Sequence, residues 1–206
     1  MKSLFFFFSL CLVILTNFQN IMKSMDEDII IDSNMTFEDA IKGTKAPDSV
    51  INTLCLLDVR YFSTDGKLHL GQLVISKEVK DDINEIFELI RETRFPIKHA
   101  IPIVRYNWSD DESMKDNNTS AFCYRFIAGT TRLSNHSYGR AVDINPFFNP
   151  VVYPDGKISP KGAEYNPENA GTLNENSPIV KKFLEKGWRW GRKFTKYADN
   201  HHFDKL

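Results

Sequence analysis

The stretch that decides the fold covers residues 54–75 and reads LCLLDVRYF, STDGK and LHLGQLVI in succession. Two apolar runs, over 54–62 and 68–75, are separated by a short polar segment that contains Asp65-Gly66. An Asp-Gly pair between two such runs is typical of the turn in a β-hairpin. We therefore predict an antiparallel hairpin over this stretch.

A helix is predicted directly after the hairpin. Ser76 is a good N-cap residue, and apolar side chains recur at helical spacing from 77 to about 93. Upstream, Thr36 is a candidate cap for a short helix over 36–42. The predicted buried face of the main helix consists of Val79, Ile83, Ile86, Phe87 and Ile90.

The second half of the chain has shorter and less regular patterns. A polar loop over 107–120 is expected to be either disordered or near a site, and 146–176 reads as an irregular segment. A helix over 178–186 should stop at Gly187. The predicted hairpins and helices do not alternate as βαβ units. This order predicts an α+β fold in which helices flank a small antiparallel sheet. Further strands are predicted over 100–105, 122–127 and 139–145.

Charge is balanced, with 26 Lys and Arg against 27 Asp and Glu. Because phosphate binding needs concentrated positive charge, this balance argues against nucleic acid as a partner. Cys55 and Cys123 remain downstream of the N-terminal segment, either paired with each other or as two buried thiols. The chain has no CxxC pair, so a thiolate zinc site is not expected.

The N-terminal segment has the pattern of an export signal. Residues 4–15 read LFFFFSLCLVIL, a length that suits the apolar part of a signal peptide. A spanning helix needs about 20 apolar residues, so this run is short for one. We assign 1–22 to a signal peptide, with an uncleaved N-terminal anchor as the alternative. The expected location is therefore the periplasm, the cell envelope or the exterior, and membrane contact would be limited to this segment.

Side chains suited to metal chemistry fall in two short windows, SNHSYGRAVD at 134–143 and DNHHFD at 199–204. A hydrolytic zinc site takes three nitrogen or oxygen ligands and leaves the fourth position to water. His136, Asp143 and one C-terminal histidine would supply that number. Spacing alone does not choose between His201 and His202.

A carboxylate near the metal can accept a proton from the bound water, and Asp199 and Asp204 are both candidates. A lone His-x6-Asp pair is commonly structural, however, and two adjacent histidines can belong to a solvated tail. Composition and spacing therefore leave both the metal site and this ordinary interpretation open.

The run SNHSYGRAVDIN resembles the SxHxxGxAxD signature of zinc D-Ala-D-Ala carboxypeptidases and L-Ala-D-Glu peptidases, the VanY-like peptidoglycan metallopeptidases. The ending DNHHFD is similar to the D/E-x-x-H-F-E ending of that family. The likeness covers roughly residues 54–206 and implies a hedgehog/DD-peptidase-like fold. It divides the chain into the signal peptide or anchor (1–22), an N-terminal extension (23–53) and a zinc peptidase domain (54–206).

The resemblance also implies roles for individual residues. It makes His136, Asp143 and His202 the zinc ligands and Asp199 the general base, three residues before the last ligand. Arg125, in SAFCYRF, would polarise the scissile carbonyl or bind a substrate carboxylate. His201 would then be an exposed neighbour. The sequence departs from the family pattern by having Asp where several members have Glu as the base, and by ending the last motif in Asp204.

These roles imply a Zn2+-dependent peptidase that hydrolyses amide bonds in peptidoglycan stem peptides. The bond would be D-Ala-D-Ala or L-Ala-D-Glu, or the enzyme would cut a different amide. The alternative from another class is a non-catalytic zinc-containing module that binds the cell wall or a partner, as hedgehog-like proteins do. The complete set of three ligands, a carboxylate and an arginine favours the enzyme.

Overall fold

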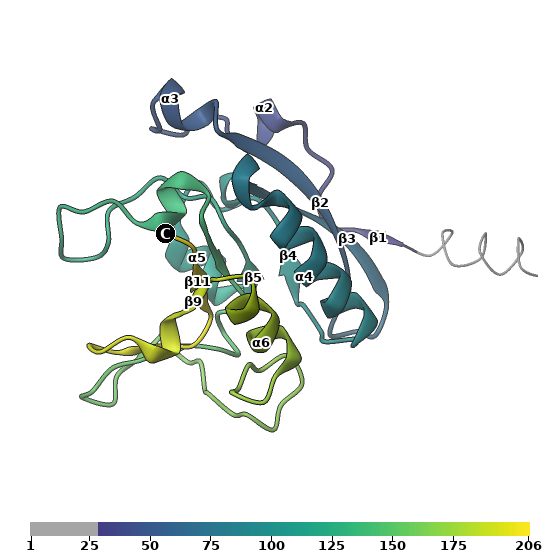
Figure 1. The fold of residues 1–206 in the computed structure, drawn as a ribbon, viewed down its shortest axis with the longest axis vertical. Helices are drawn as coiled ribbons and strands as arrows, with labels where there is room; N and C mark the ends of the chain where they lie inside the picture. The colour runs from purple at the N-terminus through teal and green to yellow at the C-terminus, as the bar shows by residue number, and fades with distance from the viewer. Residues whose placement is uncertain (1–28) are drawn as a thin grey trace, which may run out of the picture.

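A long β-hairpin and the helix that packs on it form one side of the protein, which this computed structural model describes over residues 29–206 (Figure 1). Strands β2 (Leu54–Phe62) and β3 (Leu68–Ser76) pair antiparallel along their whole length, which confirms the predicted hairpin. The short strand β1 (Ile30–Ile31) adds to β3 in parallel. The predicted signal segment 1–22, with Cys11, lies outside the described residues, as do residues 23–28.

The helix after the hairpin forms as predicted. A 3-10 turn, Lys77–Val79, leads into α4 (Lys80–Glu92), and the Ser76 hydroxyl accepts a hydrogen bond from the Glu78 amide. The five residues of its predicted apolar face are only 0 to 3% exposed. Burial of each large apolar side chain contributes about 1.5–3 kcal/mol, so this face fixes the helix on the hairpin.

The C-terminal half is built from short strands in small sheets. The one that matters for the site is antiparallel and has β11 (His202–Asp204) at its centre, between β6 (Ala141–Asp143) and β9 (Arg189–Trp190). A second antiparallel sheet contains β10 (Ala198–Asp199), β7 (Val151–Val152) and β8 (Ile158–Ser159). A parallel pair is formed by β4 (His99–Ala100) and β5 (Asn118–Thr119).

The remaining helices are short and lie around these sheets (Figure 1). The predicted helix near Thr36 is present, and the Thr36 side chain accepts a hydrogen bond from the Asp39 amide. The predicted C-terminal helix contacts α4, and Gly187 follows its end with φ +80°. These helices are α2 (Phe37–Ala40), α3 (Asp48–Ile51), α5 (Asp110–Lys115) and α6 (Pro178–Glu185).

A continuous hydrophobic core joins the two halves. It includes residues of β2, β3 and α4 together with Phe183, Trp190 and Phe203 from the C-terminal half. The rings of Phe183 and Phe203 stack with centroids 3.9 Å apart, and the ring of Trp190 is nearly parallel to that of Phe203, with centroids 6.1 Å apart. The fold is α+β, as predicted. In the described part of the chain, no helix has the length and apolar character needed to cross a bilayer.

Two of the predicted strands are wrong. Over 100–105 the strand stops at Ala100, and Pro102, which has no N–H to donate to a sheet, leads into a 3-10 turn at Ile103–Tyr106. Over 122–127 no regular strand forms. There the backbone makes isolated contacts instead, from the Phe122 amide to the Val74 carbonyl and from the Cys123 amide to the His136 carbonyl.

The polar segment 107–120 is ordered, not an open loop. It contains α5, whose first turn is capped by the Ser109 hydroxyl and holds three acidic residues. Negative side chains at a helix N-terminus are stabilising because they face the positive end of the helix dipole. The two cysteines described are free thiols, and burial raises the pKa of Cys123 to about 12.

Candidate metal centre

The β6–β11 ladder brings the two sequence windows together. His202 in β11 is the register partner of Asp143 in β6, although the two are 59 residues apart in the chain. His136 lies in a 3-10 turn, Asn135–Tyr138, just before β6. The Ser134 hydroxyl accepts a hydrogen bond from the His136 amide, so the first residue of the motif caps this turn.

Gly139 ends the turn and fixes it against the hairpin. Its φ is +63°, and a Cβ atom there would lie 2.5 Å from the backbone nitrogen of Ser76. The Ser76 amide donates a hydrogen bond to the Gly139 carbonyl at 2.9 Å. Only glycine suits both the conformation and the contact, which explains the glycine of the motif.

Three donor atoms converge at one point. Nε2 of His136 lies 3.1 Å from Oδ2 of Asp143 and 3.1 Å from Nδ1 of His202, and Nδ1 of His202 lies 3.0 Å from Oδ1 of Asp143. Ligands about 2.0–2.1 Å from zinc at tetrahedral angles are roughly 3.3 Å apart. The three residues therefore fit a tetrahedral zinc ion, with two nitrogens and one carboxylate as donors.

Hydrogen bonds behind the donors set the orientation of both rings. Nδ1 of His136 lies 2.5 Å from the carbonyl of Ala121, so this nitrogen carries the hydrogen and Nε2 presents its lone pair. Nε2 of His202 faces Oδ2 of Asp204 at 3.5 Å, which leaves Nδ1 toward the other donors. Metal-binding histidines nearly always use their second nitrogen in this way.

Asp204 is buried and already engaged by other side chains. It accepts a hydrogen bond from Nδ2 of Asn135 at 2.7 Å and two from the guanidinium of Arg189, at 2.6 and 2.8 Å. A carboxylate held in this way is poorly placed to accept a proton from water in the cleft. Of the two carboxylates that the sequence left open as the base, the geometry favours Asp199.

Charge at the centre is concentrated on Asp143. Burial acts to raise its pKa, but the neighbouring histidines His136 and His201 bring that pKa well below the usual range. Burial likewise opposes a charged His202, yet hydrogen bonds to Asp143 and Asp204 raise the pKa of His202 to about 10. A cation at this point would therefore meet an ionised carboxylate and displace a proton.

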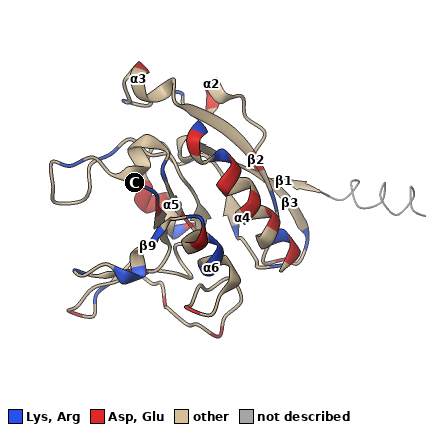
Figure 2. Ribbon diagram, viewed as in Figure 1, with Lys and Arg blue, Asp and Glu red and all other residues tan. Residues whose placement is uncertain are grey.

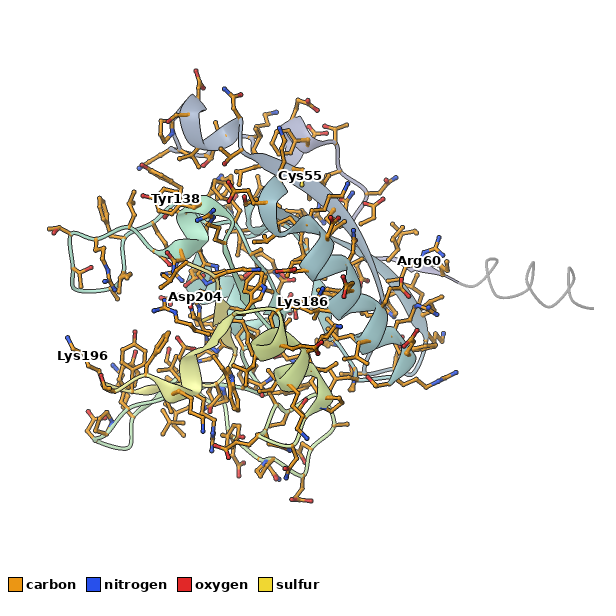
Figure 3. The ribbon with its side chains drawn as sticks, in the orientation of Figure 1. Cys55, Arg60, Tyr138, Lys186, Lys196 and Asp204 are labelled. Carbon is orange, nitrogen blue, oxygen red and sulfur yellow. The ribbon has the colours of Figure 1, made fainter. Side chains whose placement is uncertain are left out.

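Asp199 lies beside the three donors, in β10. Its side chain is 14% exposed and lines a cleft of about 1500 Å³ that His136 and His202 also line. Its Oδ1 atom is buried. The cleft walls come from residues 125–138 and from the segment 188–199, and Figure 3 shows Tyr138, Asp204 and Lys196 on the side of the molecule away from Arg60 of the hairpin.

His201 differs from its predicted place as an exposed neighbour. It is only 3% exposed, because the residue before β11 lies in the turn from β10 and points inward. Its Nδ1 lies 2.7 Å from the carbonyl of Asn149, and its Nε2 lies 3.0 Å from Oδ1 of Asp199. The two adjacent histidines mark this part of the site in the sequence. The burial of His201, the first of the two, depends on Asn149, which no sequence pattern connects to it.

Arg125 lines the same cleft as Asp199. Its guanidinium pairs with Asp110 of α5 at 2.8 Å, and the Ser137 hydroxyl bonds both its backbone amide and its backbone carbonyl. Burial acts to lower its pKa, but the carboxylates of Asp110 and Asp143 raise it, so the side chain is a fixed cation. The role of Asp110 was missed because the polar segment that contains it showed no helical signal.

The cleft combines an apolar rim with basic side chains. The partly exposed aromatic rings of Phe126 and Tyr138 lie on one wall, and Trp188 and Trp190 are buried beneath the other. The two tryptophans thus belong both to the core and to the cleft wall. Figure 2 shows basic residues on the segment after β9. The basic side chains that line the cleft are those of Arg125, Arg132, Arg189, Lys193 and Lys196.

Comparison with known proteins bears on the same region. Residues 128–205 match a family model described as D-alanyl-D-alanine carboxypeptidase. This segment contains both motifs but not Arg125. No curated protein and no solved structure matches the chain. The match supports the family resemblance drawn from SNHSYGRAVDIN and DNHHFD, and members of this family are typically metal-dependent. The similarity to this family covers residues 128–205 of the 206-residue chain.

Proposed function

We propose that this protein is a zinc-dependent peptidase that hydrolyses amide bonds in peptidoglycan stem peptides, with Asp199 as its general base. The match of residues 128–205 to the D-alanyl-D-alanine carboxypeptidase family model supports the broader statement, a peptidase that acts on peptidoglycan. The observation that carries the finer proposal is the convergence of His136, Asp143 and His202 at 3.0 to 3.1 Å, beside Asp199 in an open cleft.

Zinc held by these three residues would lower the pKa of a bound water toward neutrality and polarise a substrate carbonyl. Asp199 would accept the proton from the attacking water and later return it to the leaving amine. Its side chain suits this role because part of it reaches the cleft while Oδ1 is buried. The side chain of Asp is one methylene shorter than that of Glu. This shorter side chain still lines the cleft, because β10 places Asp199 directly on the cleft wall.

Arg125 is proposed to stabilise the negative charge that develops on the scissile carbonyl oxygen. Such stabilisation requires a donor fixed before the reaction begins. Asp110 and Ser137 hold the two ends of this residue, its guanidinium and its backbone, and so provide that rigidity.

The cleft suits an acidic peptide. Stem peptides carry free carboxylates, on D-Glu and at the D-Ala terminus, and Arg132 and Lys196 on the two walls can attract them. We further propose that the protein is exported, as the apolar run at 4–15 predicts, because peptidoglycan lies outside the cytoplasmic membrane.

The test is an assay of the purified protein on muropeptides, with products identified by mass spectrometry. Removing zinc should abolish cleavage, and adding zinc back should restore it. Asp199→Ala should lower kcat by about 10²- to 10⁴-fold. Glu164→Ala, at an exposed position outside the cleft, is the matched control.

Cleavage that survives complete zinc removal, or that Asp199→Ala leaves undiminished, would overturn the proposal. Stoichiometric zinc and peptidoglycan binding without cleavage would favour the non-catalytic module. The masses of the products would separate D-Ala-D-Ala from L-Ala-D-Glu cleavage.

A further inference from the structure

The turn before α5 has a backbone conformation that its residues rarely adopt. Asn107 and Trp108 both have positive φ, at +51° and +63°. Asparagine tolerates this left-handed region, whereas a bulky side chain such as that of tryptophan is an outlier there. Such a conformation persists only where the surrounding contacts hold it, and it occurs most often near functional sites. The contacts of Trp108 therefore show what this turn is held for.

Three contacts hold Trp108 in this conformation. Its indole nitrogen donates a hydrogen bond to the carbonyl of Lys42 at 3.1 Å, and its backbone amide donates one to the carbonyl of Ile103 at 3.3 Å. Its ring lies edge-on to that of the buried Phe122, with centroids 5.9 Å apart. Lys42 belongs to the N-terminal extension, 66 positions earlier in the chain, so the extension holds this turn directly.

The same turn places Asp110 against Arg125. Ser109 follows Trp108 and caps α5, and Asp110 is the first residue of that helix. Oδ2 of Asp110 lies 2.8 Å from Nη2 of Arg125. Ser137 bonds only the backbone of Arg125, so the ion pair with Asp110 is what restrains the guanidinium. A shift of the turn would move Asp110 and release that group.

We infer that Trp108 is a positioning residue for Arg125: it couples the N-terminal extension to the turn before α5 and so holds Asp110 where it fixes the guanidinium. This inference rests on the proposed role of Arg125 at the scissile carbonyl. Trp108 does not line the cleft, so its effect on the reaction would come through Asp110 and Arg125. The extension, which precedes the segment that matches the family model, would then be part of the catalytic unit.

Trp108→Asn separates positioning from the strain of the turn. Asparagine adopts the left-handed conformation more readily than tryptophan, so the turn stays allowed while the contacts with Lys42 and Phe122 are lost. Because a misplaced catalytic group costs up to about 10²-fold, this variant should lower kcat by about 10- to 100-fold with KM little changed. Glu112→Gln, at an exposed position of the same helix, is the matched control and should leave kcat unchanged.

A readout without turnover uses the zinc-free protein with ¹⁵N-labelled arginine. The resonance of the buried Nε of Arg125, identified by its loss in Arg125→Lys, should shift in Asp110→Asn and in Trp108→Asn, but not in Glu112→Gln. Trp108→Phe keeps a ring and loses the indole N–H group, so it should shift the resonance by less, and it replaces Trp108→Asn if that variant does not fold. A resonance that neither Trp108 variant moves would overturn the inference even if no substrate were cleaved.

The failures of the two proposals differ. Cleavage that survives complete zinc removal overturns the proposed function, whatever the Trp108 variants do. If Arg125→Ala keeps full activity, the role of Arg125 and this inference fail together, while zinc-dependent cleavage stands.

If Arg125→Ala is strongly impaired while folded Trp108→Asn is as active as the wild type, only the positioning role is overturned. The same conclusion follows if Trp108→Asn lowers kcat further in the Arg125→Ala background. A residue that acts through Arg125 should have no additional effect there.

Discussion

The ring of His202 is oriented by a carboxylate two residues further along β11. Residues i and i+2 of a strand lie on the same face, so Asp204 and His202 point the same way. Burial acts to raise the pKa of Asp204, but His202 and Arg189 hold that pKa well below its usual range. Asp204 is thus a permanent anion that connects the first motif, through Asn135, to the last ligand.

Asp204→Ala should therefore weaken zinc binding without preventing folding. The substitution frees the His202 ring and leaves Asn135 and Arg189 without their partner. Loss of such a supporting group typically lowers metal affinity about 10- to 100-fold. Competition with a chromophoric chelator measures the affinity, and Glu164→Ala serves as the control. An unaltered zinc affinity in a folded Asp204→Ala protein would contradict this account.

At the scale of elements, the centre depends on how the 3-10 turn of the motif meets the hairpin. The turn cannot move outward, because the Gly139 carbonyl is bonded to the Ser76 amide at the point where β3 passes into the helix. The hairpin and α4 thus serve as the rigid support for His136, although neither contributes a ligand.

Gly139→Ala should destabilise the protein strongly. A positive φ costs a non-glycine residue about 1–3 kcal/mol, and here the added Cβ would also meet the backbone of β3 and the side chain of Leu54. Gly66→Ala is the matched control, since Gly66 has φ +78° but no atom within 4 Å of an added Cβ. Urea unfolding should give a larger loss for Gly139→Ala than for Gly66→Ala. Equal losses would show that the close approach is unimportant.

At the scale of the whole molecule, the C-terminal end is tied back to α4. Asp82 on this helix accepts a hydrogen bond from Trp188 at 2.9 Å and one from Lys205 at 2.7 Å. These contacts span more than half of the chain and close the C-terminal half, with its proposed ligand His202, onto the hairpin and helix.

Asp82→Asn should destabilise the protein more at neutral pH than in acid. Burial acts to raise the pKa of Asp82, yet Lys205 and Trp188 lower it overall. A carboxyl with a lowered folded-state pKa contributes its full stability above its unfolded pKa, about 4, and loses it as the pH falls through the folded-state pKa. The free energy of unfolding of the wild type should therefore exceed that of the variant by about 1 kcal/mol or less at pH 7, and the difference should shrink as the pH falls below about 4. Urea unfolding followed by tryptophan fluorescence tests this, and a difference that stays constant between neutral and acidic pH would refute it.

Elements with local causes could be predicted from the sequence. The hairpin follows from Asp65-Gly66 between two apolar runs, and α4 follows from Ser76 and the helical period of its apolar face. The chemical types in the site were also visible, because the motif residues are close together in the chain. Strands over 100–105 and 122–127 failed because strand formation depends on distant partners, which the sequence does not specify.

By itself, then, the sequence determined the α+β class, the main hairpin and helix, and the residue types able to hold a metal. Only the tertiary structure decided which side chains meet. The β6–β11 register places His202 opposite Asp143, and the turn before β11 buries His201 against Asn149 and Asp199. Both outcomes depend on contacts between residues more than 50 positions apart, which local propensity and periodicity do not encode.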